Sequence, residues 1–205
     1  MRLVASLGEA WLVLVMSLVF GALLAAVQAG WGARIDQNKE NDARGRVPLL
    51  VHGADGALTP PGEDLEVKDE RGMRLYRLYR AMRKGAAAPE QIGWVLKAKG
   101  PGYADTIEVL IGMDLAAERL TGLDVLAQNE TPCLGNKIRE DPWRSQFREK
   151  AVGAVLSATK SAAASANEIK AISGATISSQ SVCDIVNQAT ADFSSKLPGL
   201  RGRKD

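Results

Sequence analysis

Residues 173–193 read SGATISSQSVCDIVNQATADF, a run of small and hydroxyl-bearing residues that leads into an apolar stripe. The stripe residues recur at helical spacing and are Val182, Ile185, Val186, Ala189 and Phe193. Ser178 and Ser179 precede the stripe as N-cap candidates, and Pro198 with Gly199 is expected to end the helix. The sequence therefore predicts a C-terminal amphipathic helix that begins just after the small residues.

Upstream of this helix, four runs rich in β-forming residues are separated by Gly and Pro. They cover residues 74–79, 92–98, 106–112 and 120–127. Short runs with turn residues between them favour an antiparallel meander. A further helix is expected from Pro142 to Leu156, with Asp141 as its cap, followed by a polar Ala/Ser/Lys-rich stretch at 157–166. The fold class is therefore expected to be α+β, with an antiparallel sheet and a C-terminal helix.

The N-terminal segment is uncharged from residue 10 to residue 33, and its first part reads AWLVLVMSLVFGALLAAV. Roughly 20 apolar residues suffice to cross a bilayer, and Trp11 and Trp31 flank the run as interfacial residues do. We expect a retained single transmembrane anchor; a signal peptide cleaved after Ala29 is the alternative. The flanking charges do not set its orientation.

Small residues recur at every fourth position of this segment, at Ser17, Gly21, Ala25 and Ala29. Such a strip allows another membrane helix to approach closely, although the spacing also arises by chance. Taken together, the patterns predict an anchor at 1–33, a membrane-proximal connector at 34–72, one folded domain at 73–197 and a tail at 198–205.

Composition limits the function. The chain has 205 residues and a net charge of +2, from 26 Lys and Arg against 24 Asp and Glu, which gives no support for nucleic-acid binding. It has 1 His and 2 Cys, and His52, Cys133 and Cys183 are isolated, so no self-contained zinc or iron–sulfur site is expected. No ionisable residue lies in the apolar segment, so the chain offers no ion pathway of its own.

The small residues before the last helix suit an anion. The first N–H groups of a helix lack partners and its dipole favours negative charge, while Gly174 and Ala175 leave room for a phosphate. Hydroxyl groups that add donors belong to Ser173, Thr176, Ser178 and Ser179. A cap without any ligand is the alternative. No Lys follows the glycine as in a Walker P-loop.

Two motifs resemble the FMN-binding domain family. One is Ser-Gly-Ala-Thr-Ile-Ser-Ser at 173–179, and the other is Glu-Thr-Pro-Cys-Leu-Gly at 130–135. Trp143, Phe147 and the Gly102-Tyr103 turn also fit the pattern of this family. It includes the G subunit of the Rnf complex and the C subunit of the sodium-pumping NADH:quinone reductase, and the length and order of parts look closest to the G subunit.

The resemblance implies a covalent FMN, joined through its phosphate to Thr176 by a separate flavin transferase that uses FAD, which makes the chain a phosphoprotein. It implies that the phosphate is lined by Ser173, Gly174, Ala175 and Ser178. It also implies that the residues near the isoalloxazine ring are Glu130, Thr131, Leu134 and Gly135. No metal site and no catalytic side chain are implied.

The resemblance also implies a role and a place. The chain would be an electron-transfer subunit of a membrane-bound, ion-translocating ferredoxin:NAD oxidoreductase of Rnf type, working with other membrane and peripheral subunits. It would sit in the lipid of the bacterial inner membrane with its flavin domain on the extracytoplasmic side. A free-standing, membrane-anchored flavoprotein reductase is the alternative. A third possibility is a binding domain that has lost its flavin, and the intact Thr176 argues against it.

Two positions depart from the family pattern. Lys170 stands six positions before Thr176, where the family often has Asp, and this bears on how the transferase recognises the site. Cys133 stands where the family usually has Gly, and a side chain there changes the loop or its contact with the ring. A Cys133–Cys183 disulfide, a buried apolar role for Cys183, and a shared iron–sulfur ligand at Cys133 remain open.

Overall fold

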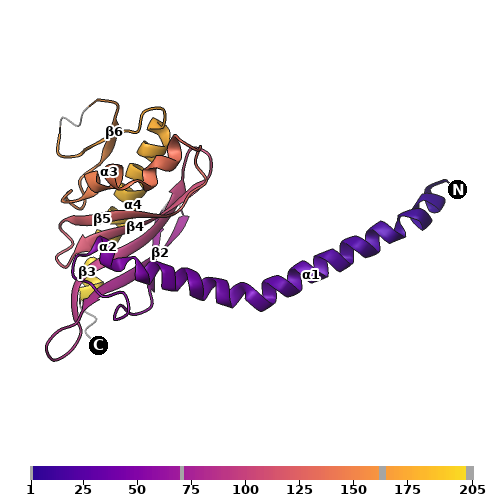
Figure 1. The fold of residues 1–205 in the computed structure, drawn as a ribbon, viewed down its shortest axis with the longest axis horizontal. Coiled ribbons are helices and arrows are strands. Elements are labelled where there is room, and N and C mark those ends of the chain that lie inside the picture. The colour runs from indigo at the N-terminus through magenta and orange to yellow at the C-terminus, as the bar shows by residue number, and fades with distance from the viewer. Residues whose placement is uncertain (1, 70–71, 162–164, 202–205) are drawn as a thin grey trace. The chain divides into compact units, whose positions relative to one another are not determined.

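The computed structural model describes residues 2–69, 72–161 and 165–201 (Figure 1), so part of the predicted tail at 198–205 lies outside the described residues. The chain divides into two units with the boundary after Asp42. The first unit is formed by helix α1 (Arg2–Gly45), which continues to the boundary and three residues past it. By length and composition α1 is able to cross a membrane, with a mean hydropathy of 2.4 in its apolar window. The expected apolar N-terminal helix is therefore present.

The second unit is built on a five-stranded antiparallel meander in the order β1-β2-β3-β4-β5. The strands are β1 (Glu63–Asp69), β2 (Gly72–Arg83), β3 (Glu90–Pro101), β4 (Thr106–Asp114) and β5 (Leu120–Ala127). Each of the four runs expected from the sequence lies inside one of β2 to β5. Together with the C-terminal helix, this confirms the α+β class.

Strand β1 and the short helix α2 (Val47–Leu50) lie in the segment expected to be a connector. The structure differs there because β1 alternates between burial and exposure: Leu65 and Val67 are buried, whereas Glu66 is exposed. Charged residues on the exposed side conceal this pattern in the sequence, and they suit an edge strand, where they discourage pairing with other chains.

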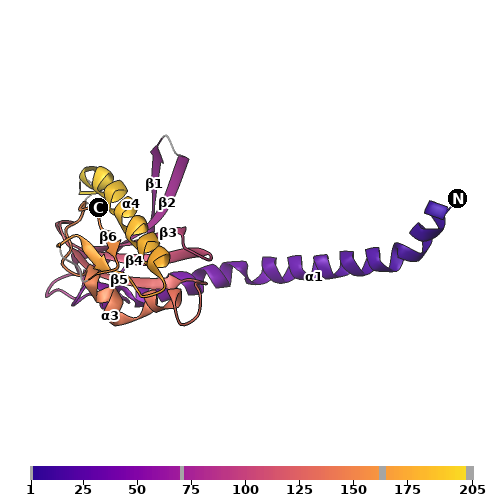
Figure 2. The ribbon, with the colours of Figure 1, turned by 90° about the horizontal axis from the view of Figure 1, so that it is seen from above.

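Both faces of the sheet are covered. Neighbouring residues of β3 alternate, so Trp94 and Leu96 join the larger core under helix α4 (Thr176–Arg201), while Val95 joins a smaller core. That smaller core contains Val47 and Leu50 of α2. Figure 2 shows α4 lying across the sheet. The sheet thus supports α4 on one face only.

All five residues of the predicted stripe on α4 are buried, and the Phe193 ring meets Trp94 edge-on at a centroid distance of 5.7 Å. The predicted ends of this helix were wrong. It begins at Thr176, which puts Ser178 and Ser179 inside the first turn, and it continues through Pro198 to Arg201. A proline near the end removes only one backbone hydrogen bond, and Leu197 and Leu200, on either side of it, pack on the core.

The prediction of a helix from Pro142 to Leu156 was also wrong. The structure has only short turns there, namely α3 (Asp141–Arg144) and η2 (Ser145–Phe147), after η1 (Gly135–Arg139). The chain then turns back to β5, where the Leu120 N–H donates to the Lys150 carbonyl at 2.8 Å. The Lys150 carbonyl is thus bonded to β5 and not to an N–H further along its own segment, so the segment does not continue as a helix. Strands β6 (Ser157–Thr159) and β7 (Glu168–Lys170) follow as a parallel pair.

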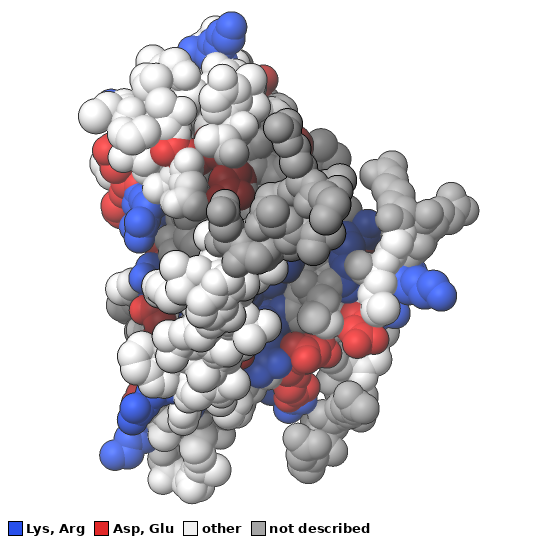
Figure 3. All heavy atoms as spheres, turned by 90° about the vertical axis from the view of Figure 1, so that its right-hand side faces the viewer, with Lys and Arg blue, Asp and Glu red and all other residues white. Residues whose placement is uncertain are grey.

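A polar cluster ties the second half of α4 to β2. Asp192 accepts hydrogen bonds from Arg74 Nε at 2.7 Å and from the Tyr76 hydroxyl at 2.6 Å. Burial and the neighbouring Asp192 carboxylate raise the pKa of Tyr76, so the phenol remains a donor. Elsewhere basic and acidic side chains are interspersed, as on the face in Figure 3. The ion pair of Arg77 and Asp64, between β1 and β2, is more exposed than the ion pair of Arg74 and Asp192.

We expect Asp192→Ala to lower the free energy of unfolding by about 2 kcal/mol, because it leaves two partly buried donors without their acceptor. The measurement is urea unfolding of the full chain in detergent, followed by tryptophan fluorescence. Asp64→Ala is the matched control, and loss of its exposed pair should cost less than about 1 kcal/mol. Equal losses in the two variants would contradict the role given to Asp192.

Candidate functional site

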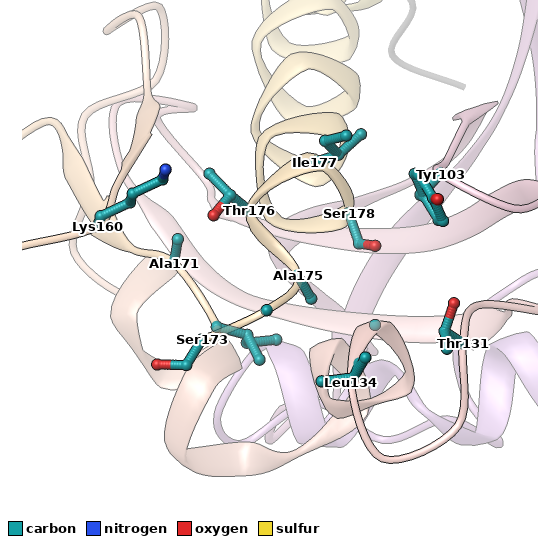
Figure 4. A pocket seen from close by; sticks show the side chains of 13 residues that line it. Tyr103, Thr131, Leu134, Lys160, Ala171, Ser173, Ala175, Thr176, Ile177 and Ser178 are labelled. Carbon is teal, nitrogen blue, oxygen red and sulfur yellow. The ribbon is translucent and has the colours of Figure 1, made fainter.

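A cavity of about 720 Å³ opens at the start of α4 (Figure 4). Four parts of the chain meet there: the turn after β3, the loop after β5, the residue after β6 and the segment from β7 into α4. The residues that line it are Tyr103, Thr131, Leu134, Gly135, Lys160, Ala171, Ile172, Ser173, Gly174, Ala175, Thr176, Ile177 and Ser178. The volume lies within the range of about 300–1,000 Å³ that small-molecule and cofactor sites occupy.

Eight of the nine residues that the sequence marks for the flavin line this cavity. The exception is Glu130, which is 4% exposed and lies behind the lining. One carboxylate oxygen of Glu130 accepts a hydrogen bond from the Ala104 N–H at 3.0 Å, and the other accepts one from the Ser178 hydroxyl. Glu130 therefore joins two walls of the cavity. The proposal that it packs against the ring has no support from this geometry.

Two of the hydroxyls expected to serve an anion are already engaged. Ser178 donates its proton to Glu130. Ser179 is fully buried; its hydroxyl donates to the Ala175 carbonyl at 2.9 Å and accepts from the Ile172 N–H at 3.1 Å. These bonds fix the turn that starts α4. The hydroxyls left at the cavity are those of Ser173, which is exposed, and Thr176, which is half-buried.

The turn into α4 requires a glycine at position 174. Gly174 has φ +80°, in the left-handed region, and a Cβ there would lie 2.9 Å from a methyl carbon of Leu134. At Gly135 the constraint is packing, because a Cβ would lie 2.8 Å from Ser178 Oγ. Both glycines therefore let the loop after β5 approach the helix start closely.

Five lining residues were not proposed as ligands from the sequence: Tyr103, Lys160, Ala171, Ile172 and Ile177. Tyr103 was noticed only as part of a turn. Lys160 lies in the Ala/Ser/Lys-rich stretch, and it reaches the cavity because β6 pairs in parallel with β7, which runs directly into the cavity wall. No local signal in the sequence marks that pairing.

Comparison with known families matches residues 102–191 to the FMN-binding domain. Over 179 residues the chain is 31% identical to the G subunit of the Na(+)-translocating ferredoxin:NAD(+) oxidoreductase complex of Acetobacterium woodii, covering 85% of each protein. It is also 31% identical to the G subunit of the ion-translocating oxidoreductase complex of Pseudomonas aeruginosa, covering 91% of this chain and 88% of that protein. The chain belongs to the G-subunit family of these complexes. The resemblance inferred from the two motifs is confirmed.

Solved structures agree on the fold of this G-subunit family member. The C subunit of the Na(+)-translocating NADH-quinone reductase of Parabacteroides distasonis superposes with a TM-score of 0.59 at 18% identity, over 80% of this chain and 96% of that one. NqrC of Shewanella oneidensis gives a TM-score of 0.55 at 16% identity, over 68% and 69%. Identities this low support a shared fold and nothing more specific.

The cavity of this G-subunit family member fits FMN. The first N–H groups of a helix have no partner within it, so the start of α4 suits a phosphate, and Gly174 leaves the backbone open to it. The opposite end, at Tyr103 and Thr131, offers an aromatic ring and a hydroxyl, and Leu134 adds an aliphatic side chain beside Gly174; these groups suit a planar heterocycle. The expectation that FMN is the cofactor is therefore supported by the family and by the cavity.

The two departures from the family pattern have visible consequences. Cys133 is an exposed free thiol and Cys183 is a buried one, so the structure contains no disulfide between them. Cys133 adopts φ +61°, which is strained for a residue with a Cβ and natural for the usual glycine. At Lys170 the backbone carbonyl accepts from Trp143 Nε1 at 3.0 Å, so this position is fixed through its main chain whatever its side chain.

We expect Cys133→Gly to raise the free energy of unfolding by about 0.5–1 kcal/mol. Strain of about 1–2 kcal/mol is removed, and the extra freedom of glycine in the unfolded chain offsets part of it. Urea unfolding measures the change. Cys133→Ala is the control; because it keeps the Cβ, it should stay close to wild type, and equal stabilisation by both variants would contradict the assignment to backbone strain.

Proposed function

We propose that this chain is an electron-transfer subunit that carries FMN covalently at Thr176 within an ion-translocating oxidoreductase complex of Rnf type. One observation carries the proposal: in a member of the G-subunit family, the threonine of the motif stands at the first position of α4 and faces the cavity that fits FMN. The named relatives are themselves parts of complexes, which favours this role over that of a free-standing reductase.

The attachment step is a transfer from FAD. The Thr176 hydroxyl forms an Oγ–P bond to the flavin-side phosphorus, the bond between the two phosphates of FAD breaks, and AMP leaves; the hydroxyl proton passes to a base of the separate flavin transferase. The N–H groups at the start of α4 stabilise the negative charge of the phosphate. The product is a phosphodiester, so the cofactor stays attached in every redox state.

When bound, FMN supplies the electron-transfer chemistry, and the chain sets its position and surroundings. Tyr103, Leu134 and Ile177 are 63%, 41% and 59% exposed at the cavity. A ring held among these side chains would keep an edge close to the protein surface. That arrangement suits exchange of electrons with a neighbouring protein of the complex, because the centres can approach without any opening of the fold.

The decisive variant is Thr176→Val, which keeps the shape of the side chain and removes the acceptor hydroxyl. After co-expression with a flavin transferase, wild type should give a fluorescent band on a denaturing gel and an added mass of FMN less water. Thr176→Val should give neither. Ser173→Ala removes the neighbouring exposed hydroxyl and should keep both signals. A band that persists in Thr176→Val would contradict the acceptor, and no band in wild type would contradict covalent attachment.

We further propose that α1 anchors the chain in the bacterial inner membrane and that the flavin domain lies on the extracytoplasmic side. The apolar composition of α1 supports the anchor. The proposal that the flavin domain lies on the extracytoplasmic side of the membrane rests on the family resemblance, since the charges that flank the helix do not decide its orientation. The remaining subunits of the complex, membrane lipid and the transferase are the partners that this arrangement requires.

The two cysteines provide a test of orientation. Cys133 is exposed, whereas burial shields Cys183 and raises the pKa of its thiol to about 12, which keeps it protonated and unreactive. A membrane-impermeant maleimide applied to spheroplasts should therefore label the native chain once, at Cys133. The variant Cys133→Ser should remain unlabelled. Labelling of Cys133 only after lysis would place the domain on the cytoplasmic side.

A further inference from the structure

Lys160 is held at the cavity by the main chain. The register of the parallel pair sets Thr159 beside Lys170, and the Ala171 N–H donates to the Thr159 carbonyl at 2.7 Å. Residue 160 therefore stands next to the segment that runs from β7 into α4. Two side chains of α4 fix this strand and the residue before it: Gln180 accepts from the Ala158 N–H at 2.8 Å, and Asn187 bonds both polar groups of the Leu156 backbone at 2.8 Å.

The lysine is the source of positive charge at this cavity. Of the 13 lining residues, all within the described part of the chain, Lys160 is the one with a charged side chain. In Figure 4 its side chain stands on the Thr176 side of the cavity, while Tyr103 and Thr131 stand at the other end. The charge is therefore at the end where the phosphate is expected, away from the place of the uncharged ring.

The ammonium group of Lys160 does not stabilise the fold through hydrogen bonds as the ammonium group of Lys150 does. Lys150 donates to the carbonyls of Ala166 and Glu168, at 2.5 and 3.2 Å, and so supports the fold. Within residues 2–69, 72–161 and 165–201, the Lys160 ammonium makes no hydrogen bond or ion pair, and the residue is exposed. A cation beside an otherwise uncharged cavity is suited to an anionic ligand.

We propose that the Lys160 ammonium binds the phosphate that joins FMN to Thr176, and that it orients the FAD diphosphate while the bond to Thr176 forms. The inference rests on the proposed covalent attachment and adds a positioning residue to it. The bonds made and broken are those of the transfer itself, and Lys160 stays protonated throughout. Its contribution is charge: one ammonium faces one negative charge in the product and two in the diphosphate of the donor.

The test is the initial rate of flavin incorporation into the full-length protein in detergent, with purified transferase and limiting FAD. Lys160→Gln should slow incorporation about five- to tenfold, the effect of losing one charge-assisted contact near the surface. Lys160→Arg should stay within about threefold of wild type, because it keeps the charge. The control is Lys84→Gln, which changes an exposed lysine just after β2 that does not line the cavity; it should match wild type.

The dependence of the rate on ionic strength and the ³¹P spectrum of the loaded protein distinguish binding of the phosphate by Lys160 from contact with the transferase alone. The gap between wild type and Lys160→Gln should shrink as ionic strength rises, because salt screens an exposed pair. The ³¹P resonance of the loaded phosphodiester should shift in Lys160→Gln and stay in place in Lys84→Gln. A slow variant with an unshifted resonance would mean that Lys160 contacts only the transferase, and this overturns the proposal.

Failure of the Lys160 proposal can be distinguished from failure of the proposed function. If wild type incorporates flavin and Lys160→Gln matches it, the role of Lys160 is refuted while attachment at Thr176 stands. If wild type incorporates none with an active transferase, the proposed function itself fails. Thermal unfolding of Lys160→Gln should match wild type, and a large loss of stability there would instead indicate a structural lysine.

Discussion

The buried carboxylate of Glu130 is the contact on which the cavity depends. A charged group out of contact with water is costly unless it is fully hydrogen-bonded, and Glu130 obtains its bonds from the Ala104 N–H and the Ser178 hydroxyl. These donors belong to the turn after β3 and to the first turn of α4. The carboxylate thus draws both segments onto the loop after β5, and the space left between them is the cavity.

Helix α4 is fixed at successive points along its length, and this gives the cavity a rigid wall. Ser178 holds its start to Glu130, Gln180 and Asn187 hold its first half to the β6 segment, and Asp192 holds its second half to β2. The apolar stripe between these contacts lies on the sheet. A residue at the start of α4, such as Thr176, is therefore positioned by the whole unit.

The site shows both close packing and local strain. Gly174 and Gly135 allow backbone and side chains to approach where a Cβ would collide, whereas Cys133 occupies a left-handed conformation at a cost. The cavity nevertheless remains open, because Tyr103, Leu134 and Ile177 keep much of their surface exposed. An open cavity is compatible with a covalently attached cofactor, because the cofactor cannot diffuse away. The same openness allows a redox partner to reach it.

The sequence by itself determined the elements whose signal is local: the uncharged helix, the runs that became β2 to β5, the stripe on α4 and the motif that contains Thr176. It also determined the family, because two motifs stand in the right order. Only the tertiary structure decided that Glu130 lies behind the cavity and that Lys160 reaches it. Those placements come from a hydrogen bond across 48 residues and from a parallel pairing of two three-residue strands, and neither leaves a periodic pattern in the sequence.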